Sequence, residues 1–127
     1  MDQSIEPISS GKIVAVVDDD PAVRNSLKFS LETEGLVVRA FAAGQELMEA
    51  VKDETINCVV IEFRLEDIDG VALTDHMRSK GLRTPIIMLT RHPNKMLKQY
   101  AAQRNIPIVE KPLVGNTLMD TIRRLLI

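Results

Sequence analysis

The sequence contains little cysteine and few aromatic residues, and both low contents exclude some classes of protein and of partner. The single cysteine, Cys58, cannot form an internal disulfide and precedes the apolar run at 59–61, so we expect a buried thiol in a reducing compartment. Tryptophan is missing and aromatic residues make up 3% of the chain, so stacking platforms for nucleic-acid bases are excluded. The 16 basic and 18 acidic side chains leave a net charge of -2. Without a basic surface, no direct nucleic-acid partner is expected.

Long hydrophobic runs are also missing. No apolar stretch approaches the ~20 residues of a membrane span, and the N-terminus carries Asp2 and Glu6 where a secretory signal carries basic residues. We therefore expect no membrane partner and a cytoplasmic location. Residues 1–10 are polar and lack periodicity, which predicts a flexible tail before one domain at 11–127. Because the last predicted helix reaches the final residue, a stand-alone domain is expected.

From Gly11 onwards, apolar runs of strand length alternate with segments of helical period. The expected strands are 13–17, 36–41, 57–63, 85–90 and 106–109, and the expected helices are 21–34, 45–52, 70–80, 94–104 and 118–126. Helices between apolar strands return the chain to the same end of the sheet, which predicts parallel strands and right-handed crossovers. The predicted fold class is α/β: a flavodoxin-like (βα)5 doubly wound sheet of five strands in the order 2-1-3-4-5.

Polar side chains stand at the carboxyl ends of four predicted strands. Asp18 and Asp19 follow the first strand, Glu62 belongs to the end of the third, Thr90 ends the fourth and Lys111 follows the fifth. Ligands of doubly wound sheets bind beyond these strand ends, so one shared pocket is expected. Three clustered carboxylates need a cation, which Lys111 supplies in part and Mg²⁺ supplies with oxygen ligands. A solvated acid cluster is the alternative, but it leaves Lys111 unexplained.

Four motifs in fixed order resemble the receiver domain of two-component response regulators, over residues 11–127. The motifs are Val14-Ala15-Val16-Val17-Asp18-Asp19-Asp20-Pro21, the segment from Glu62 to Gly70, Leu89-Thr90, and Lys111-Pro112. The likeness is greatest to receivers that precede nitrogen-fixation-type transcription factors. The resemblance implies a Mg²⁺ site at Asp18 and Asp19, with the Glu62 position and the backbone carbonyl of Arg64 completing it. It also implies that Thr90 is the switch hydroxyl, that Lys111 pairs with the phosphoryl group, and that the following peptide bond is cis.

The main departure from the family is at the phosphoacceptor. Relatives carry aspartate there, whereas the matching residue in this chain is Glu62. An extra methylene displaces the nucleophilic oxygen, and a misplacement of about 1 Å costs roughly a hundredfold in rate. The longer side chain is instead expected to reach toward Lys111 and Thr90 and to imitate a phosphorylated state. The imitation is incomplete, with a charge of about -1 against about -1.5 to -2 for a phosphoryl group.

Two more departures concern the switch. Ile108, three residues before Lys111, stands where relatives carry an aromatic rotamer switch, and it has no ring to move inward. Arg91 replaces a small residue of relatives, and two readings remain open. Its guanidinium either folds over the pocket to pair with Glu62 or Asp19, or is solvated. With positive side chains beside the carboxylates, only weak Mg²⁺ binding is expected.

Two functions remain. The first is a pseudo-receiver that signals through protein contact, is not an enzyme and is not phosphorylated. The alternative is a working receiver that accepts a phosphoryl group from a histidine kinase on Glu62 in a phosphorelay. Haloacid-dehalogenase phosphatases need a later acidic pair that does not follow Lys111, and a flavin-phosphate loop is disfavoured by three aspartates. The expected partner is a histidine kinase or an output protein, with a homodimer through the 94–104 helix, the fifth strand and the last helix as a further option.

Overall fold

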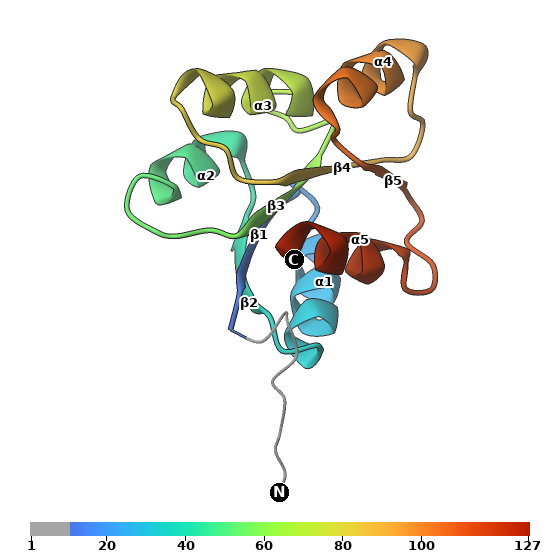
Figure 1. Cartoon of the computed structure of the whole chain (residues 1–127). Helices are drawn as coiled ribbons and strands as arrows, with labels where there is room; N and C mark the ends of the chain where they lie inside the picture. Colours follow the sequence, from blue (N-terminus) through green and yellow to red (C-terminus); the bar gives the residue numbers. More distant parts are fainter. Residues whose placement is uncertain (1–10) are drawn as a thin grey trace, which may run out of the picture.

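The computed structural model describes residues 11–127, and the tail expected at 1–10 lies outside the described residues. One parallel sheet has the strand order β2-β1-β3-β4-β5, which confirms the predicted doubly wound α/β fold. The elements in chain order are β1 (Ile13–Val17), α1 (Pro21–Thr33), β2 (Val37–Phe41), α2 (Gly44–Ala50), β3 (Cys58–Glu62), α3 (Gly70–Ser79), β4 (Ile86–Thr90), α4 (Lys95–Arg104), β5 (Ile108–Glu110) and α5 (Thr117–Leu126). Helices α1 and α5 cover one face of the sheet, and α2, α3 and α4 cover the other (Figure 1).

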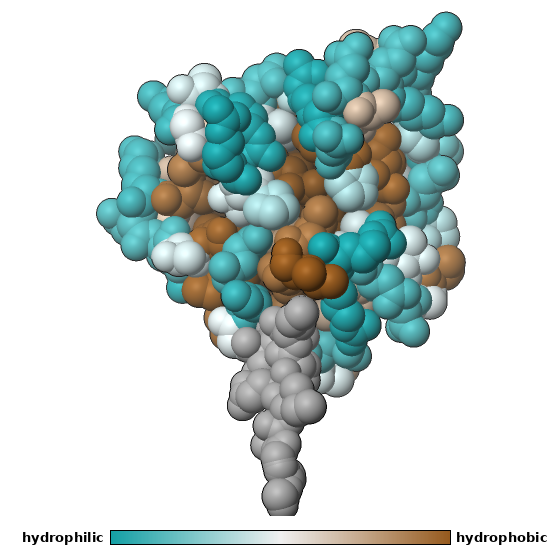
Figure 2. All heavy atoms as spheres, viewed as in Figure 1, coloured by the Kyte–Doolittle hydropathy of each residue, from teal (hydrophilic) through white to brown (hydrophobic). Residues whose placement is uncertain are grey.

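The alternation of side chains along each strand divides the core into two layers. Val14 and Val16 of β1 belong to the cluster that contains Leu27 of α1 and Ile122 of α5. The intervening strand residues, such as Val17, point into a second cluster with α2, α3 and α4. Strands β3 and β4 are buried along their whole length, as expected for central parallel strands. In Figure 2, hydrophilic side chains cover the outer helices, while apolar side chains show between the two helix layers.

Several boundaries differ from those predicted. The strand predicted at 106–109 is β5 at Ile108–Glu110, since Pro107 has no N–H to donate to a neighbouring strand. The helix predicted at 45–52 ends earlier, at Ala50, and turns follow it. None of the helices within residues 11–127 is both long and apolar enough to cross a bilayer.

A polar contact joins α3 to α4. The Tyr100 hydroxyl on α4 donates a 2.6 Å hydrogen bond to Oδ1 of Asp75 on α3. The Arg104 guanidinium lies 3.8 Å from the centre of the Tyr100 ring. Burial, followed by the hydrogen bond and negative charge of Asp75, raises the pKa of Tyr100 to about 12, because both effects favour the protonated phenol. The contact therefore holds the two helices together with a neutral tyrosine.

Candidate functional site

A polar pocket of about 260 Å³ lies at the carboxyl ends of β1, β3, β4 and β5. It is lined by Asp18, Asp19, Asp20, Glu62, Arg64, Thr90, Arg91, His92 and Lys111. Each apolar strand fills the core and then ends, so the next side chains lie at the rim of the sheet where the strands meet. The structure therefore brings together the predicted site residues, with the exception of Ile108. That residue begins β5 opposite Met88 and does not line the pocket.

Lys111 joins two buried carboxylates. Its Nζ donates to Oδ2 of Asp18 at 2.9 Å and to Oε1 of Glu62. The side chains are 9% exposed for Lys111, 1% for Asp18 and 10% for Glu62. Burial lowers the pKa of Lys111, but the hydrogen bonds and negative charges of Glu62 and Asp18 outweigh that effect and raise this pKa above its ordinary value. Lys111 is therefore held as a cation between the two acids.

The other carboxylate oxygen of each acid accepts a backbone N–H. Oδ1 of Asp18 accepts from the N–H of Asp20 at 2.9 Å. Oε2 of Glu62 accepts from the N–H of Arg64 at 2.9 Å. All four carboxylate oxygens of the two acids thus have a donor. The glutamate side chain is held at both oxygens, by the lysine and by its own following loop.

Thr90 and Arg91 do not make the contacts to Glu62 that the sequence suggested. Thr90 is buried, and its Oγ1 accepts a long, 3.4 Å hydrogen bond from the N–H of His92. In the part of the chain from 11 to 127, Glu62 makes no hydrogen bond to Thr90. Arg91 is exposed, and within the same residues it pairs with neither Glu62 nor Asp19. The guanidinium lid is therefore not formed, because Lys111 and the backbone already satisfy the Glu62 carboxylate.

Two contacts near the site were missed by the sequence analysis. Nη1 of Arg24, on α1, donates a 2.7 Å hydrogen bond to the backbone carbonyl of Asp18. Its position four residues after the helix-capping Asp20 places it one turn into α1, which is the signal that was available. Asp67, in the β3–α3 loop, accepts from the N–H groups of Gly44 and Gln45 at 3.1 Å each. That contact spans more than twenty residues of sequence, and no local pattern indicates it.

A family model described as the response regulator receiver domain matches residues 14–123. The chain belongs to this family. It is 32% identical over 110 residues to DctR of Rhodobacter capsulatus, a C4-dicarboxylate transport transcriptional regulatory protein, covering 84% of this chain and 56% of that protein. It is 31% identical over 110 residues to the transcriptional regulatory protein FixJ of Bradyrhizobium diazoefficiens, covering 86% and 54%.

Solved receivers have the same fold. The crystal structure of full-length FixJ from B. japonicum matches with a TM-score of 0.83 and 29% identity, over 91% of this chain and 58% of that one. A CheY-like receiver from Methanospirillum hungatei matches with a TM-score of 0.80 and 27% identity, over 92% and 94%. The chain spans about half the length of the first curated relatives, at 48%, 56% and 54%. The similarity shared with them is therefore that of the receiver module.

Asp18 and Glu62, two of the carboxylates that the resemblance assigns to Mg²⁺, already have donors within the chain. Across residues 11–127, no three histidine, cysteine, aspartate or glutamate side chains are grouped so as to hold a metal ion. The ammonium of Lys111 stands between Asp18 and Glu62, and the second Glu62 oxygen is bonded to the Arg64 N–H. Asp19 lines the same pocket and is half-buried, but it takes no part in the ion pair of Lys111 with Asp18 and Glu62. The positive charge at the site is already supplied by the chain.

Proposed function

We propose that this receiver is a pseudo-receiver, a signalling module that acts through protein contact without phosphorylation and without enzyme activity. The observation that carries the proposal is the Glu62 carboxylate, bound by Lys111 at one oxygen and by the Arg64 N–H at the other. A glutamate stands where the family resemblance implies the phosphoacceptor aspartate. Both of its oxygens are engaged before any phosphodonor arrives.

This arrangement opposes phosphoryl transfer in two ways. In-line attack requires an oxygen aligned about 3–3.5 Å from phosphorus, and an extra methylene moves the Glu62 oxygens from the position that aspartate would give them. Attack also requires Glu62 to leave a nearly buried ion pair with Lys111, which then keeps Asp18 as its one carboxylate partner, and separating buried charges is costly. Slow or undetectable chemistry at Glu62 follows from both effects.

The same contacts support a state that resembles the signalled one. In the phosphorylated relatives implied by the resemblance, the residue matching Lys111 pairs with the phosphoryl group, and here Lys111 pairs with Glu62. Glu62 supplies one negative charge, against about -1.5 to -2 for a phosphoryl group, and it does not bond Thr90 among the described residues. The glutamate therefore imitates the contact to lysine and omits the contact to the hydroxyl.

The wild-type protein is expected to stay unmodified when incubated with Mg²⁺ and acetyl phosphate. The reason is the engaged and displaced Glu62 carboxylate. Intact-mass spectrometry at intervals measures any phosphoryl adduct, and an ordinary receiver in the same tube serves as the positive control. A stoichiometric adduct on Glu62 would reject the pseudo-receiver proposal.

That outcome would favour the second candidate, a working receiver that accepts a phosphoryl group from a histidine kinase. This candidate is supported by the other residues expected at a phosphorylation site, because Asp18, Asp19, Thr90 and Lys111 all line one pocket. The observation against it is that Lys111 and Arg64 already occupy both oxygens of Glu62.

Magnesium is expected to bind weakly to the wild-type protein. The ion must compete with the Lys111 ammonium for Asp18 and Glu62, and Mg²⁺ gives up its hydration water reluctantly. A titration followed by amide NMR shifts at Asp19 and Asp20 should show little change at physiological magnesium. Shifts that saturate at low magnesium concentration would contradict this expectation.

The partner surface that we propose consists of α4, β5 and α5. The family resemblance implies that receivers use this surface to form dimers and to contact output domains. Among its charged residues are Lys95, Lys98, Arg104, Asp120 and Arg123. Lys98 is exposed, whereas Arg123 pairs with Asp120 and with Glu34, the C-cap residue of α1. A mixed-charge surface suits an oriented protein partner, either a histidine kinase, an output protein or a second copy of the chain. We propose that these partners are met in the cytoplasm, and that the domain contacts neither a membrane nor nucleic acid directly.

Charge reversal is expected to identify this surface. Lys98→Glu should weaken self-association roughly two- to tenfold, because a surface charge pair contributes about 0.2–1 kcal/mol and reversal turns attraction into repulsion. Arg123→Glu should act in the same direction, although it also breaks the contact to Glu34. Sedimentation velocity over a concentration series measures the effect, with Lys52→Glu on the turn after α2 as the control. Equal effects at all three positions would exclude the surface.

A further inference from the structure

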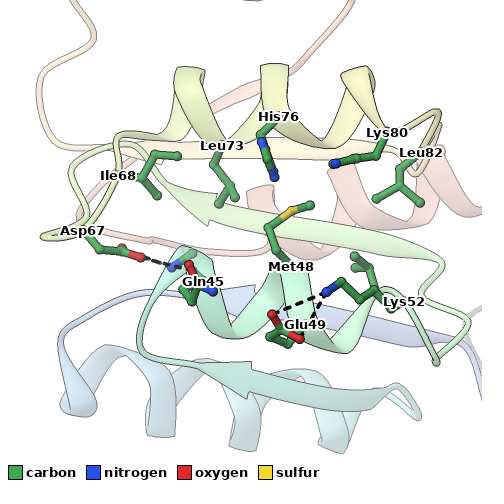
Figure 3. Close-up of a pocket in the computed structure, with 12 residues that line it drawn as sticks. Gln45, Met48, Glu49, Lys52, Asp67, Ile68, Leu73, His76, Lys80 and Leu82 are labelled. Carbon is green, nitrogen blue, oxygen red and sulfur yellow. Dashed lines mark hydrogen bonds and ion pairs between the residues drawn. The ribbon is translucent and has the colours of Figure 1, made fainter.

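A separate groove of about 640 Å³ lies between α2 and α3. It is lined by residues of both helices, of the β3–α3 loop and of the turn after α3, and it shares none of them with the polar pocket (Figure 3). Pockets for small ligands are commonly 300–1,000 Å³, so the groove has a suitable size. Nothing in the proposed signalling function uses it.

The groove is closed at one end and apolar inside. At the closed end, a Cβ added to Gly44 would lie 2.6 Å from Cγ2 of Ile68, so the first turn of α2 is already in close contact with the β3–α3 loop. Leu73 of α3 is fully buried behind the groove. Met48 extends from α2 toward α3, and Leu82 lies on the side of the groove after α3 (Figure 3). Methionine adapts its shape readily, which favours an apolar occupant of variable outline.

The acidic side chains in the groove are already engaged. Glu49 pairs with Lys52 at 3.3 Å. Asp67 accepts backbone N–H groups at both of its oxygens, at 3.1 Å each, from Gly44 and Gln45. Neither carboxylate is therefore available to balance a positive ligand.

The opposite wall carries His76 and the cation Lys80, and neither has an ion-pair partner among residues 11–127. His76 and Lys80 extend from α3 and its C-terminal cap into the space facing α2 (Figure 3). Both residues are exposed. A cation after the last turn of α3 also complements the partial negative charge of a helix C-terminus. That role explains the charge of Lys80, but it does not explain the apolar floor beside it.

We propose that the groove binds a small molecule with an apolar body and one carboxylate group. The apolar body packs against Met48, Ile68 and Leu82, which are partly exposed, and the carboxylate pairs with Lys80 beside His76. This inference is independent of the pseudo-receiver proposal, since the groove and the polar pocket have no lining residue in common. The β3–α3 loop connects the two, because Asp67 and Ile68 line the groove and Arg64 of the same loop contacts Glu62.

Octanoate is a suitable probe, with octanol and octylamine as neutral and cationic probes of the same apolar body. In amide NMR titrations of the full chain, octanoate should shift resonances at 44–52 and 67–82 in a saturable manner. Octanol should bind more weakly and octylamine weakest. Lys80→Gln should weaken octanoate binding roughly two- to fivefold, as expected for one partly exposed ion pair, and should leave octanol binding unchanged.

The matched control is Lys28→Gln, which removes an exposed lysine of α1 that does not line the groove. It should leave octanoate binding unchanged, and both variants should lower the unfolding midpoint by no more than a few degrees, because each loses only one surface interaction. Equal affinity for octanoate and octanol would reject the carboxylate, and Lys80 would then serve the helix terminus alone. Absent shifts, or shifts spread evenly over the protein, would reject the site itself. None of these results depends on whether Glu62 accepts a phosphoryl group.

Discussion

Glu62→Asp is expected to accept a phosphoryl group under conditions in which the proposed function predicts that the wild-type protein stays unmodified. The substitution removes one methylene, withdraws the carboxylate from the Arg64 N–H and gives the residue the length that the family resemblance implies for the phosphoacceptor. A correction of about 1 Å in the position of a nucleophile corresponds to roughly a hundredfold in rate. Intact-mass spectrometry after incubation with acetyl phosphate measures the adduct, with and without Mg²⁺.

Glu62→Gln is the matched control, because it keeps the length of the side chain and removes the nucleophilic charge. It should remain unmodified under the same conditions. Adding Arg91→Ala to Glu62→Asp should increase the adduct only slightly, since Arg91 is exposed and pairs with no carboxylate of the pocket in residues 11–127. An inert Glu62→Asp protein that remains folded would show that side-chain length is not what prevents the reaction.

Lys111→Met should lower the free energy of unfolding by about 3–5 kcal/mol, because it leaves two nearly buried carboxylates without their cation. Urea unfolding followed by far-ultraviolet circular dichroism measures the change. The dependence on pH has a definite sign. Since the pKa of Lys111 is raised, its stabilising contribution is complete below the ordinary value of 10.5 and is lost as the pH rises through the higher value of the folded state.

Lys28→Met provides the comparison for this result. Lys28 pairs with Glu32 on the surface of α1, where both side chains are more than 40% exposed, at 46% and 43%, and such pairs contribute about 0–1 kcal/mol. The double variant Lys111→Met with Glu62→Gln should recover part of the lost stability, because one uncompensated charge is removed. Equal losses in Lys28→Met and Lys111→Met would mean that the buried ion pair is not maintained in solution.

The fold was predictable because hydrophobic periodicity reports directly on burial. The fully apolar stretch around Val59 becomes the buried strand β3, and Asp20 caps α1 at the N–H of Ala22, as the Asp-Pro pair predicts. The meeting of Asp18, Glu62 and Lys111 was also predictable, because parallel strands bring their carboxyl ends to one edge. These features depend on pattern and topology alone.

The remaining details depend on competition between groups that are distant in sequence. Arg91 was a candidate partner for Glu62, but the Lys111 ammonium and the Arg64 N–H take both oxygens. Asp19 lines the same pocket, but Lys111 pairs with Asp18 and Glu62 and not with Asp19. Tertiary packing determines which donor bonds a given carboxylate, and the packing of residues distant in sequence cannot be read from local sequence patterns.

Helix α2 has consequences for the order of folding. It has seven residues, and its N-cap, Ala43, offers no side-chain hydrogen bond. Helices much shorter than ~12–15 residues are marginal on their own. The missing cap is supplied by Asp67, from the loop after β3. We therefore expect segment 44–50 to become stably helical only when β3 and the loop that follows it are in place.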